Sequence, residues 1–276
     1  MIALGLLVVA ALCHAGWNLL IKSAPGQGPE FVWLYSVIAL PGALGLLGWS
    51  LAEGTALPSL WPGLVSMLLH TGYALVLQSA YRVGEFSVVY PVSRGTPPAL
   101  VTLATIPWTG WPRPLAWCGL ALVLGGVLAV EWVDRRPGAA RGVWLGLGVA
   151  ACGCAYTLWD AYAITALGVH VLPYLAVGNL GQVLLLTVFV RARGTALRPV
   201  LAHWRRALPV ALLIPAGYGL VLVALALEPV AAVATGRTLN VVLGVLLGAL
   251  VLRERITPSR LAGLAAVVAG VLLVSA

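Results

Sequence analysis

Two arginines interrupt apolar segments of the chain. Arg94 and Arg237 each lie eight or nine residues into a run long enough to cross a membrane. An ionisable side chain at that depth is costly unless it is paired or hydrated, so it usually faces a cavity or a partner. A guanidinium group offers a planar fork of donors that matches carboxylate or phosphate. Both arginines are therefore candidate ligands for an anionic group, with structural cations bonded to free backbone carbonyls as the alternative.

An acid lies among aromatic residues in another apolar run. Asp160 follows Trp159 and lies four residues after Tyr156, a spacing that puts Tyr156 and Asp160 on one helix face. His14 and Asn18 have the same spacing in the first run. An acid among aromatic faces suits an ammonium group, through charge pairing and cation–π contact. The alternative is that Asp160 pairs with an arginine and the aromatic residues lie at the membrane interface.

Four more aromatic residues are candidates for lining a binding site. They are Trp17, Tyr73, Tyr90 and Tyr218. His14 and His70 are candidate proton carriers, because an imidazole titrates near physiological pH, although hydrogen-bonded buried histidines are the alternative. Cys152 and Cys154 point to different faces of a helix, and no second ligand cluster accompanies them, so we expect neither a metal nor another cofactor. No nucleophile elbow, phosphate loop or metalloprotease motif argues for an enzyme.

The elements that carry these residues are expected to be membrane helices. The 276 residues are 61% hydrophobic and 9% charged, whereas a soluble domain is roughly half apolar and a quarter charged. A membrane helix needs about 20 apolar residues, and the continuous runs exclude a membrane barrel. The sequence predicts an all-α membrane protein with ten such helices, at 2–22, 29–51, 59–82, 85–107, 114–133, 142–166, 171–192, 204–227, 229–251 and 258–275.

The chain also repeats itself at offsets of 142 to 145 residues, which indicates an internal duplication. Recurring residues are Trp17-Asn18 with Trp159-Asp160, Tyr73 with Tyr218, Glu85 with Glu228, Arg94 with Arg237, and Pro114, Gly119 and Gly126 with Pro258, Gly263 and Gly270. The expected repeats are residues 1–134 and 142–276. Because five helices per half is an odd number, the second half must be inverted relative to the first. Inverted repeats around a central cavity are the layout of many alternating-access transporters.

The net charge of +8 does not indicate nucleic-acid binding, because the basic residues are scattered over short loops. Lys and Arg concentrate in cytoplasmic loops of membrane proteins. In the ten-helix arrangement one side carries Lys22, Arg82, Arg135, Arg136, Arg141, Arg191, Arg193, Arg198, Arg205, Arg206, Arg253, Arg255 and Arg260, and a loop on the other side carries Arg113. The bias predicts a multi-pass protein of a bacterial inner membrane with both termini outside the cytoplasm.

Three motifs carry a resemblance to a known family. They are Cys13–Asn18 (CHAGWN), Tyr90–Gly95 (YPVSRG) and Leu252–Pro258 (LRERITP). With them the chain resembles the drug/metabolite transporter superfamily, EamA type. The resemblance implies a ten-helix basket around a central cavity, and members that carry amino acids, amines, sugars or organophosphates. In plastid phosphate translocators, relatives by resemblance, basic residues on the matching helices hold the phosphate. The first half departs from the pattern, with Trp108–Trp111 where the second half has Arg253–Arg255.

Together these features predict a secondary transporter that moves a small polar metabolite by alternating access. The expected cargo is a zwitterion or organic anion such as an amino acid or an organophosphate. An exporter of cationic amines or drugs and a membrane-embedded enzyme are the alternatives. Expected partners are the small-molecule substrate and the lipid bilayer, and a coupling proton or a counter-substrate is left open.

Overall fold

A computed structural model describes residues 2–22, 28–83, 86–131, 139–240, 242–243, 246 and 258–275, and over these residues the chain is helical and contains no strand. The helices are α1 (Ile2–Lys22), α2 (Pro29–Ala52), α3 (Leu60–Val83), α4 (Phe86–Gly95), α5 (Pro97–Thr109), α6 (Pro114–Glu131), α7 (Ala139–Thr165), α8 (Val171–Ala192), α9 (Leu197–Leu201), α10 (Trp204–Leu225), α11 (Val230–Gly236) and α13 (Pro258–Ser275). A short 3₁₀ helix, η1 (Leu57–Ser59), precedes α3.

Five of the described helical segments are long and apolar enough to cross a membrane. They are Pro29–Ala52, Leu57–Leu77, Trp144–Thr165, Val171–Ala192 and Trp204–Leu225, and shorter apolar helices cover Ile2–Trp17, Pro114–Ala129 and Leu261–Val274. Large apolar side chains point outward from these helices: Leu184, Val188 and Leu212 are between 62% and 69% exposed. Apolar side chains on the outer surface are compatible with contact to lipid. The backbone is compatible with lipid too, because helices satisfy their own backbone hydrogen bonds.

The segment expected as one span at 85–107 is two helices. α4 ends at Gly95 and α5 begins at Pro97, with Thr96 between them. The reason is that Pro97 and Pro98 have no backbone N–H, so the hydrogen bonds that would continue α4 through them cannot form. A proline at the first helical position is instead well suited to start α5.

The expected span at 229–251 also begins with a short helix. α11 ends at Gly236, Arg237 is its C-cap, and the Asn240 N–H donates to the Arg237 carbonyl in a 3₁₀-like turn. Most of the remainder of this span lies outside the described residues. Arg94 and Arg237 therefore occupy comparable places, each within one residue of the end of a short helix.

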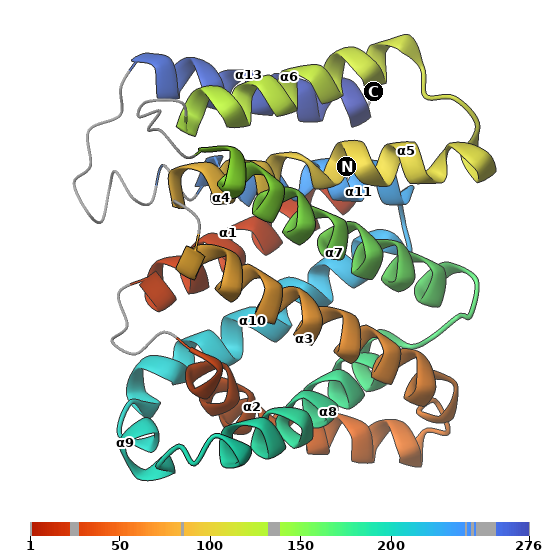
Figure 1. The fold of residues 1–276 in the computed structure, drawn as a ribbon. Helices are drawn as coiled ribbons and strands as arrows, with labels where there is room; N and C mark the ends of the chain where they lie inside the picture. The colour runs from red at the N-terminus through yellow and green to blue at the C-terminus, as the bar shows by residue number, and fades with distance from the viewer. Residues whose placement is uncertain are drawn as a thin grey trace.

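Two helix pairs form opposite edges of the bundle. In Figure 1, α6 and α13 lie side by side at one edge and α2 and α8 at the other, while α1 packs on α10 and α3 on α7. Glycines let α6 and α13 approach closely: a Cβ on Gly119 would lie 2.7 Å from the Gly270 carbonyl oxygen, and one on Gly126 would lie 2.6 Å from that of Gly263. Because the residue numbers run in opposite directions, the two helices are antiparallel.

Candidate functional site

Both arginines line one cavity, which we call the arginine cavity. It lies where α3, α4, α5, α7 and α11 meet, and its lining residues are Tyr73, Ser93, Arg94, Pro97, Pro98, Gly153, Tyr156, Thr157, Ala234, Arg237, Thr238 and Asn240. Arg94 lies beside the break after α4 and Arg237 lies at the end of α11, and both border this cavity. Two cations from distant parts of the sequence therefore share one space.

Arg237 is held in the cavity by two hydroxyl groups of α7. Its Nη2 donates to the Tyr156 hydroxyl at 2.9 Å and its Nη1 to Thr157 Oγ1 at 3.2 Å. Its guanidinium carbon also lies 5.4 Å from the centroid of the Tyr156 ring. These partners orient the guanidinium without neutralising it, because hydroxyl groups and aromatic rings carry no net charge. Among the described residues, no carboxylate forms an ion pair with Arg237.

Arg94 borders the cavity from the last turn of α4, just before the break at Thr96. It is half-buried at the end of α4, next to the buried Ser93, and the first residues of α5, Pro97 and Pro98, line the same space. Pro97 and Pro98 therefore border the cavity beside Arg94.

Arg237 also borders a smaller cavity on the side of α1. His14 and Asn240 are its other polar lining residues. The His14 Nδ1 lies 2.7 Å from the Ala10 carbonyl oxygen, so this nitrogen donates, and the His14 ring lies 6.0 Å from that of Trp17. This arrangement puts His14 beside the predicted anion ligand but leaves Trp17 outside both cavity linings.

Asp160 lies in a separate buried cluster, which we call the aspartate cluster. Its Oδ1 accepts hydrogen bonds from Ser66 and from the Tyr174 hydroxyl, both at 2.7 Å, and its Oδ2 accepts one from the Tyr218 hydroxyl at 2.7 Å. The His70 Nε2 lies 3.7 Å from the same Oδ2. Asp160 is 1% exposed. Hydroxyl donors from three other helices thus replace water around this carboxylate.

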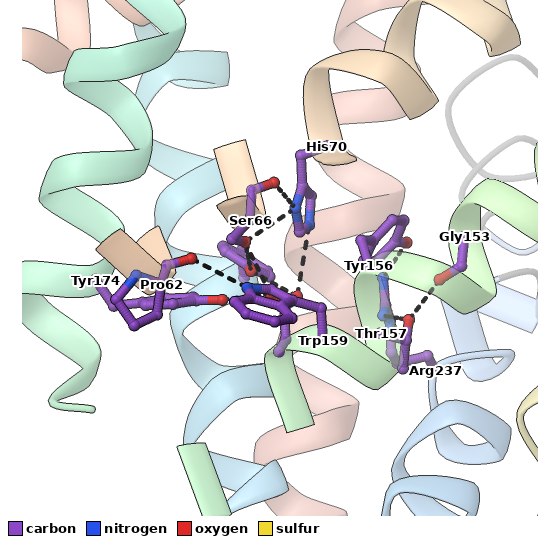
Figure 2. Close-up of polar contacts among 11 residues, drawn as sticks. Pro62, Ser66, His70, Gly153, Tyr156, Thr157, Trp159, Tyr174 and Arg237 are labelled. Atoms are coloured by element: carbon purple, nitrogen blue, oxygen red, sulfur yellow. Dashed lines mark hydrogen bonds and ion pairs between the residues drawn. The ribbon is translucent and has the colours of Figure 1, made fainter. Parts of the chain in front are cut away.

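Figure 2 shows how the aspartate cluster and the arginine cavity adjoin. Tyr156 lies between them. Its hydroxyl accepts a hydrogen bond from Arg237, and its ring centroid lies 4.1 Å from that of His70. The Tyr73 ring lies 5.2 Å from the Tyr156 ring, and the Tyr218 ring lies 4.8 Å from His70. A continuous set of aromatic contacts therefore joins the two sites.

The structure separates other residues that sequence reasoning grouped together. Trp159 does not line the arginine cavity: its indole N–H donates to the Pro62 carbonyl at 3.0 Å, and its ring packs against Trp61 and Tyr162. The side chains of Asn18 and Tyr90 lie outside the described part of the structure. The pairing of Trp159 with Trp17 around one substrate group therefore has no counterpart in the described contacts.

Three residues that hydrogen-bond to Asp160 or Arg237 were not singled out from the sequence. Ser66 precedes His70 by four residues on α3, a spacing that puts both on one helix face and could have drawn attention to it. Tyr174 belongs to α8 and Thr157 follows Tyr156 directly. Neither had a local signal, because single hydroxyl groups are common in apolar helices and each finds its partner only through tertiary packing.

Long apolar helices packed around an internal cavity that two arginines line define a class: an integral membrane protein. The family comparison is more specific. Residues 140–276 match the model of the EamA-like transporter family, and the chain belongs to this family within the drug/metabolite transporter superfamily. It is accordingly a membrane transporter of small molecules. The resemblance carried by the three sequence motifs is confirmed.

The fold has a relative among solved structures. A crystal structure of a protein that is 20% identical in sequence superposes with a TM-score of 0.76, over 99% of this chain and 97% of the other. At this identity the likeness shows a shared fold alone. No curated protein sequence matches the chain.

Proposed function

We propose that this chain is a secondary transporter that moves a small zwitterion or organic anion, such as an amino acid or an organophosphate, by alternating access. The observation that supports this most directly is that Arg94 and Arg237 line one cavity. Like charges repel each other more strongly inside a protein than in water, because the dielectric constant is lower there. An anionic group between them removes that repulsion and gains charge-assisted hydrogen bonds.

The aspartate cluster argues against a purely cationic amine or drug as cargo. Asp160 is not among the residues that line the arginine cavity, and three hydroxyl groups already occupy its oxygens. A cation entering the cavity would instead face Arg94 and Arg237. An amino group of a zwitterion could still contact the Tyr73 and Tyr156 rings, which border the same space.

We further propose that residues 1–134 and 142–276 are inverted repeats, which together supply ten spans. On this proposal α4 and α5 form one broken span, and α11 begins another. The glycine contacts support it: Gly119 meets Gly270 and Gly126 meets Gly263, and the repeat mate of Gly119 is Gly263 while that of Gly126 is Gly270. Such reciprocal contacts are what a two-fold axis between the halves produces. The pairs α1–α10 and α3–α7 are related in the same way.

The proposed setting is a bacterial inner membrane with both termini outside the cytoplasm, from the loop bias of Lys and Arg. Alternating access then needs the halves to rock about the cavity that contains the arginines. A proton or a counter-substrate is the proposed source of energy.

Uptake by purified protein in liposomes tests the proposed function. Labelled L-glutamate, L-alanine and glycerol 3-phosphate would be compared with a lipophilic cation. We expect uptake of at least one of the first three, its loss in Arg94→Gln and Arg237→Gln, and its retention in Arg113→Gln, whose side chain is exposed in a loop. Transport of the cation alone, unaffected by either cavity substitution, would refute the proposal.

A further inference from the structure

We propose that His70 and Asp160 form a proton-binding site, and that a proton taken up there accompanies the anion across the membrane in the same direction. The inference rests on the proposed function for its anion, but its evidence is the geometry of the aspartate cluster. It assigns a role to a pair that the anion site does not use.

The hydrogen bonds of His70 fix where its first proton lies. The Nδ1 is 3.0 Å from the Ser66 carbonyl oxygen, which can only accept, so the Nδ1 carries a hydrogen. In the neutral imidazole the Nε2 then bears a lone pair. That lone pair points toward Asp160 Oδ2 at 3.7 Å, an oxygen that also has lone pairs. Two acceptors face each other, and one added proton between them turns the contact into an attraction.

The added proton belongs on His70 rather than on Asp160. Three hydroxyl groups already donate hydrogen bonds to the Asp160 oxygens. The His70 side chain is also 26% exposed, whereas that of Asp160 is 2% exposed, so the imidazole is the member that can exchange protons with its surroundings. The loaded site is therefore an imidazolium beside a carboxylate, and the unloaded site is a neutral imidazole beside the same carboxylate.

The groups around His70 come from every described helix packed against this part of α3. α7 contributes Asp160 and Tyr156, α8 contributes Tyr174, α10 contributes Tyr218, and α4 carries Arg94. On α3 itself Tyr73 packs against Tyr156. Beyond Tyr156 lies Arg237. Among these described groups, Asp160 and Arg237 carry the charges that adjoin His70, the first directly and the second across Tyr156.

This charge balance sets the sign of the coupling. With His70 neutral, the charges of Asp160 and Arg237 balance each other. A proton alone would leave one net positive charge, and a monovalent anion alone would leave one net negative charge. A proton and a monovalent anion together restore the starting balance, so each favours the binding of the other. Mutual stabilisation of this kind leads to cotransport, because the state with both bound is the one that forms most readily.

Tyr156 gives the two sites a physical connection. Its hydroxyl accepts a hydrogen bond from Arg237, where an anion can compete for the same N–H, and its ring packs against the imidazole that gains the proton. An aromatic face beside a newly charged imidazolium contributes a cation–π attraction. Tyr156 therefore contacts both the proposed anion ligand, Arg237, and the proposed proton acceptor, His70.

Calorimetric titration with two anions that do not titrate near neutral pH, L-glutamate and sulfate, tests the inference. Each binding enthalpy would be measured in two buffers of different ionisation enthalpy. We expect the enthalpies to differ by an amount that corresponds to uptake of up to about one proton per bound anion. His70→Gln should still bind the anion but show the same enthalpy in both buffers. The matched control is His170→Gln, which should retain the enthalpy difference. His170 is exposed, and in the described hydrogen bonds it contacts Ser59 through its backbone alone.

The outcomes separate the two proposals. If wild-type protein binds an anion with equal enthalpy in both buffers, or if His70→Gln retains the difference, the proton site is wrong and the anion site stands. If neither anion binds to the wild type, the anion site is wrong and the coupling fails with it. Equal wild-type enthalpies refute the proton site even where the His70 variant does not fold.

Discussion

Arg237 donates a hydrogen bond of 2.9 Å to the Tyr156 hydroxyl. The guanidinium that we propose as a ligand for the substrate is therefore held by a neutral group that the substrate can displace. The bond orients the guanidinium in the arginine cavity. An anion that approaches Arg237 competes with this hydroxyl for the same N–H. The relationship makes Tyr156 a determinant of affinity, and its effect can be measured.

Tyr156→Phe should bind sulfate more tightly than the wild type. The substitution leaves one guanidinium N–H without its hydroxyl acceptor, so an incoming anion gains a hydrogen bond without having to replace one. A typical hydrogen bond contributes about 1 kcal/mol, which corresponds to an increase in affinity of roughly five-fold. Titration calorimetry measures it, with the exposed Tyr162→Phe on the same helix as the control. An unchanged or weaker affinity would show that the hydroxyl does not compete.

Asp160→Asn should destabilise the protein more than Tyr174→Phe. The first change replaces an oxygen that accepts hydroxyl hydrogen bonds with an amide that donates, and the second removes one donor among three. An unsatisfied buried polar group costs about 1–3 kcal/mol, against about 1 kcal/mol for a single lost hydrogen bond. Thermal unfolding in detergent measures both. If Asp160→Asn unfolds at the wild-type temperature, the carboxylate does not anchor the cluster.

A methyl group at the α6–α13 crossing should destabilise the protein, while the same change one residue away should not. In Gly126→Ala the new Cβ would lie 2.6 Å from the Gly263 carbonyl oxygen, so the helices must separate. Overpacking of this kind costs about 1–3 kcal/mol. A Cβ at Gly125 meets nothing within 4 Å, and alanine is favoured over glycine in a helix by about 0.5–1 kcal/mol. Equal unfolding temperatures for the two variants would contradict the close approach.

The orientation in the membrane can be tested with reporters fused to the C-terminus. The loop bias of Lys and Arg predicts an active alkaline phosphatase fusion and a dark green fluorescent protein fusion, because both termini are expected outside the cytoplasm. A fluorescent fusion with an inactive phosphatase would reverse the orientation.

Sequence reasoning identified Arg94 and Arg237 because the signal is local: a charge within an apolar run is conspicuous whatever packs around it. The same reasoning gave the helical character of the chain and most helix positions. The break between α4 and α5 was not expected although Pro97 and Pro98 were visible, because a proline can either kink a membrane helix or end it, and neighbouring packing decides which.

The surroundings of Asp160 could not be derived in the same way. Its partners come from α3, α8 and α10, and nothing in the spacing of Ser66, Tyr174 and Tyr218 shows that they converge. The pattern of residues around Asp160 also grouped it with Trp159, although a helix turns by about 100° between consecutive residues. Trp159 consequently faces Pro62 while Asp160 faces the hydroxyl groups.

We propose that Arg94 and Arg237 together bind the anionic group of the substrate. The measurement that tests it most directly is the dissociation constant of L-glutamate and of sulfate for the wild type and for the Lys and Gln variants at both positions, with Arg113→Gln as the control. Lys keeps the charge but loses the planar fork, and Gln loses both. We expect affinity to fall in the order wild type, Lys, Gln at either position. The Gln variants should lose about 1.5–3 kcal/mol, roughly 10- to 150-fold, while Arg113→Gln binds as the wild type does. If both Gln variants fold and bind each anion with wild-type affinity, the arginines are structural and the account is wrong.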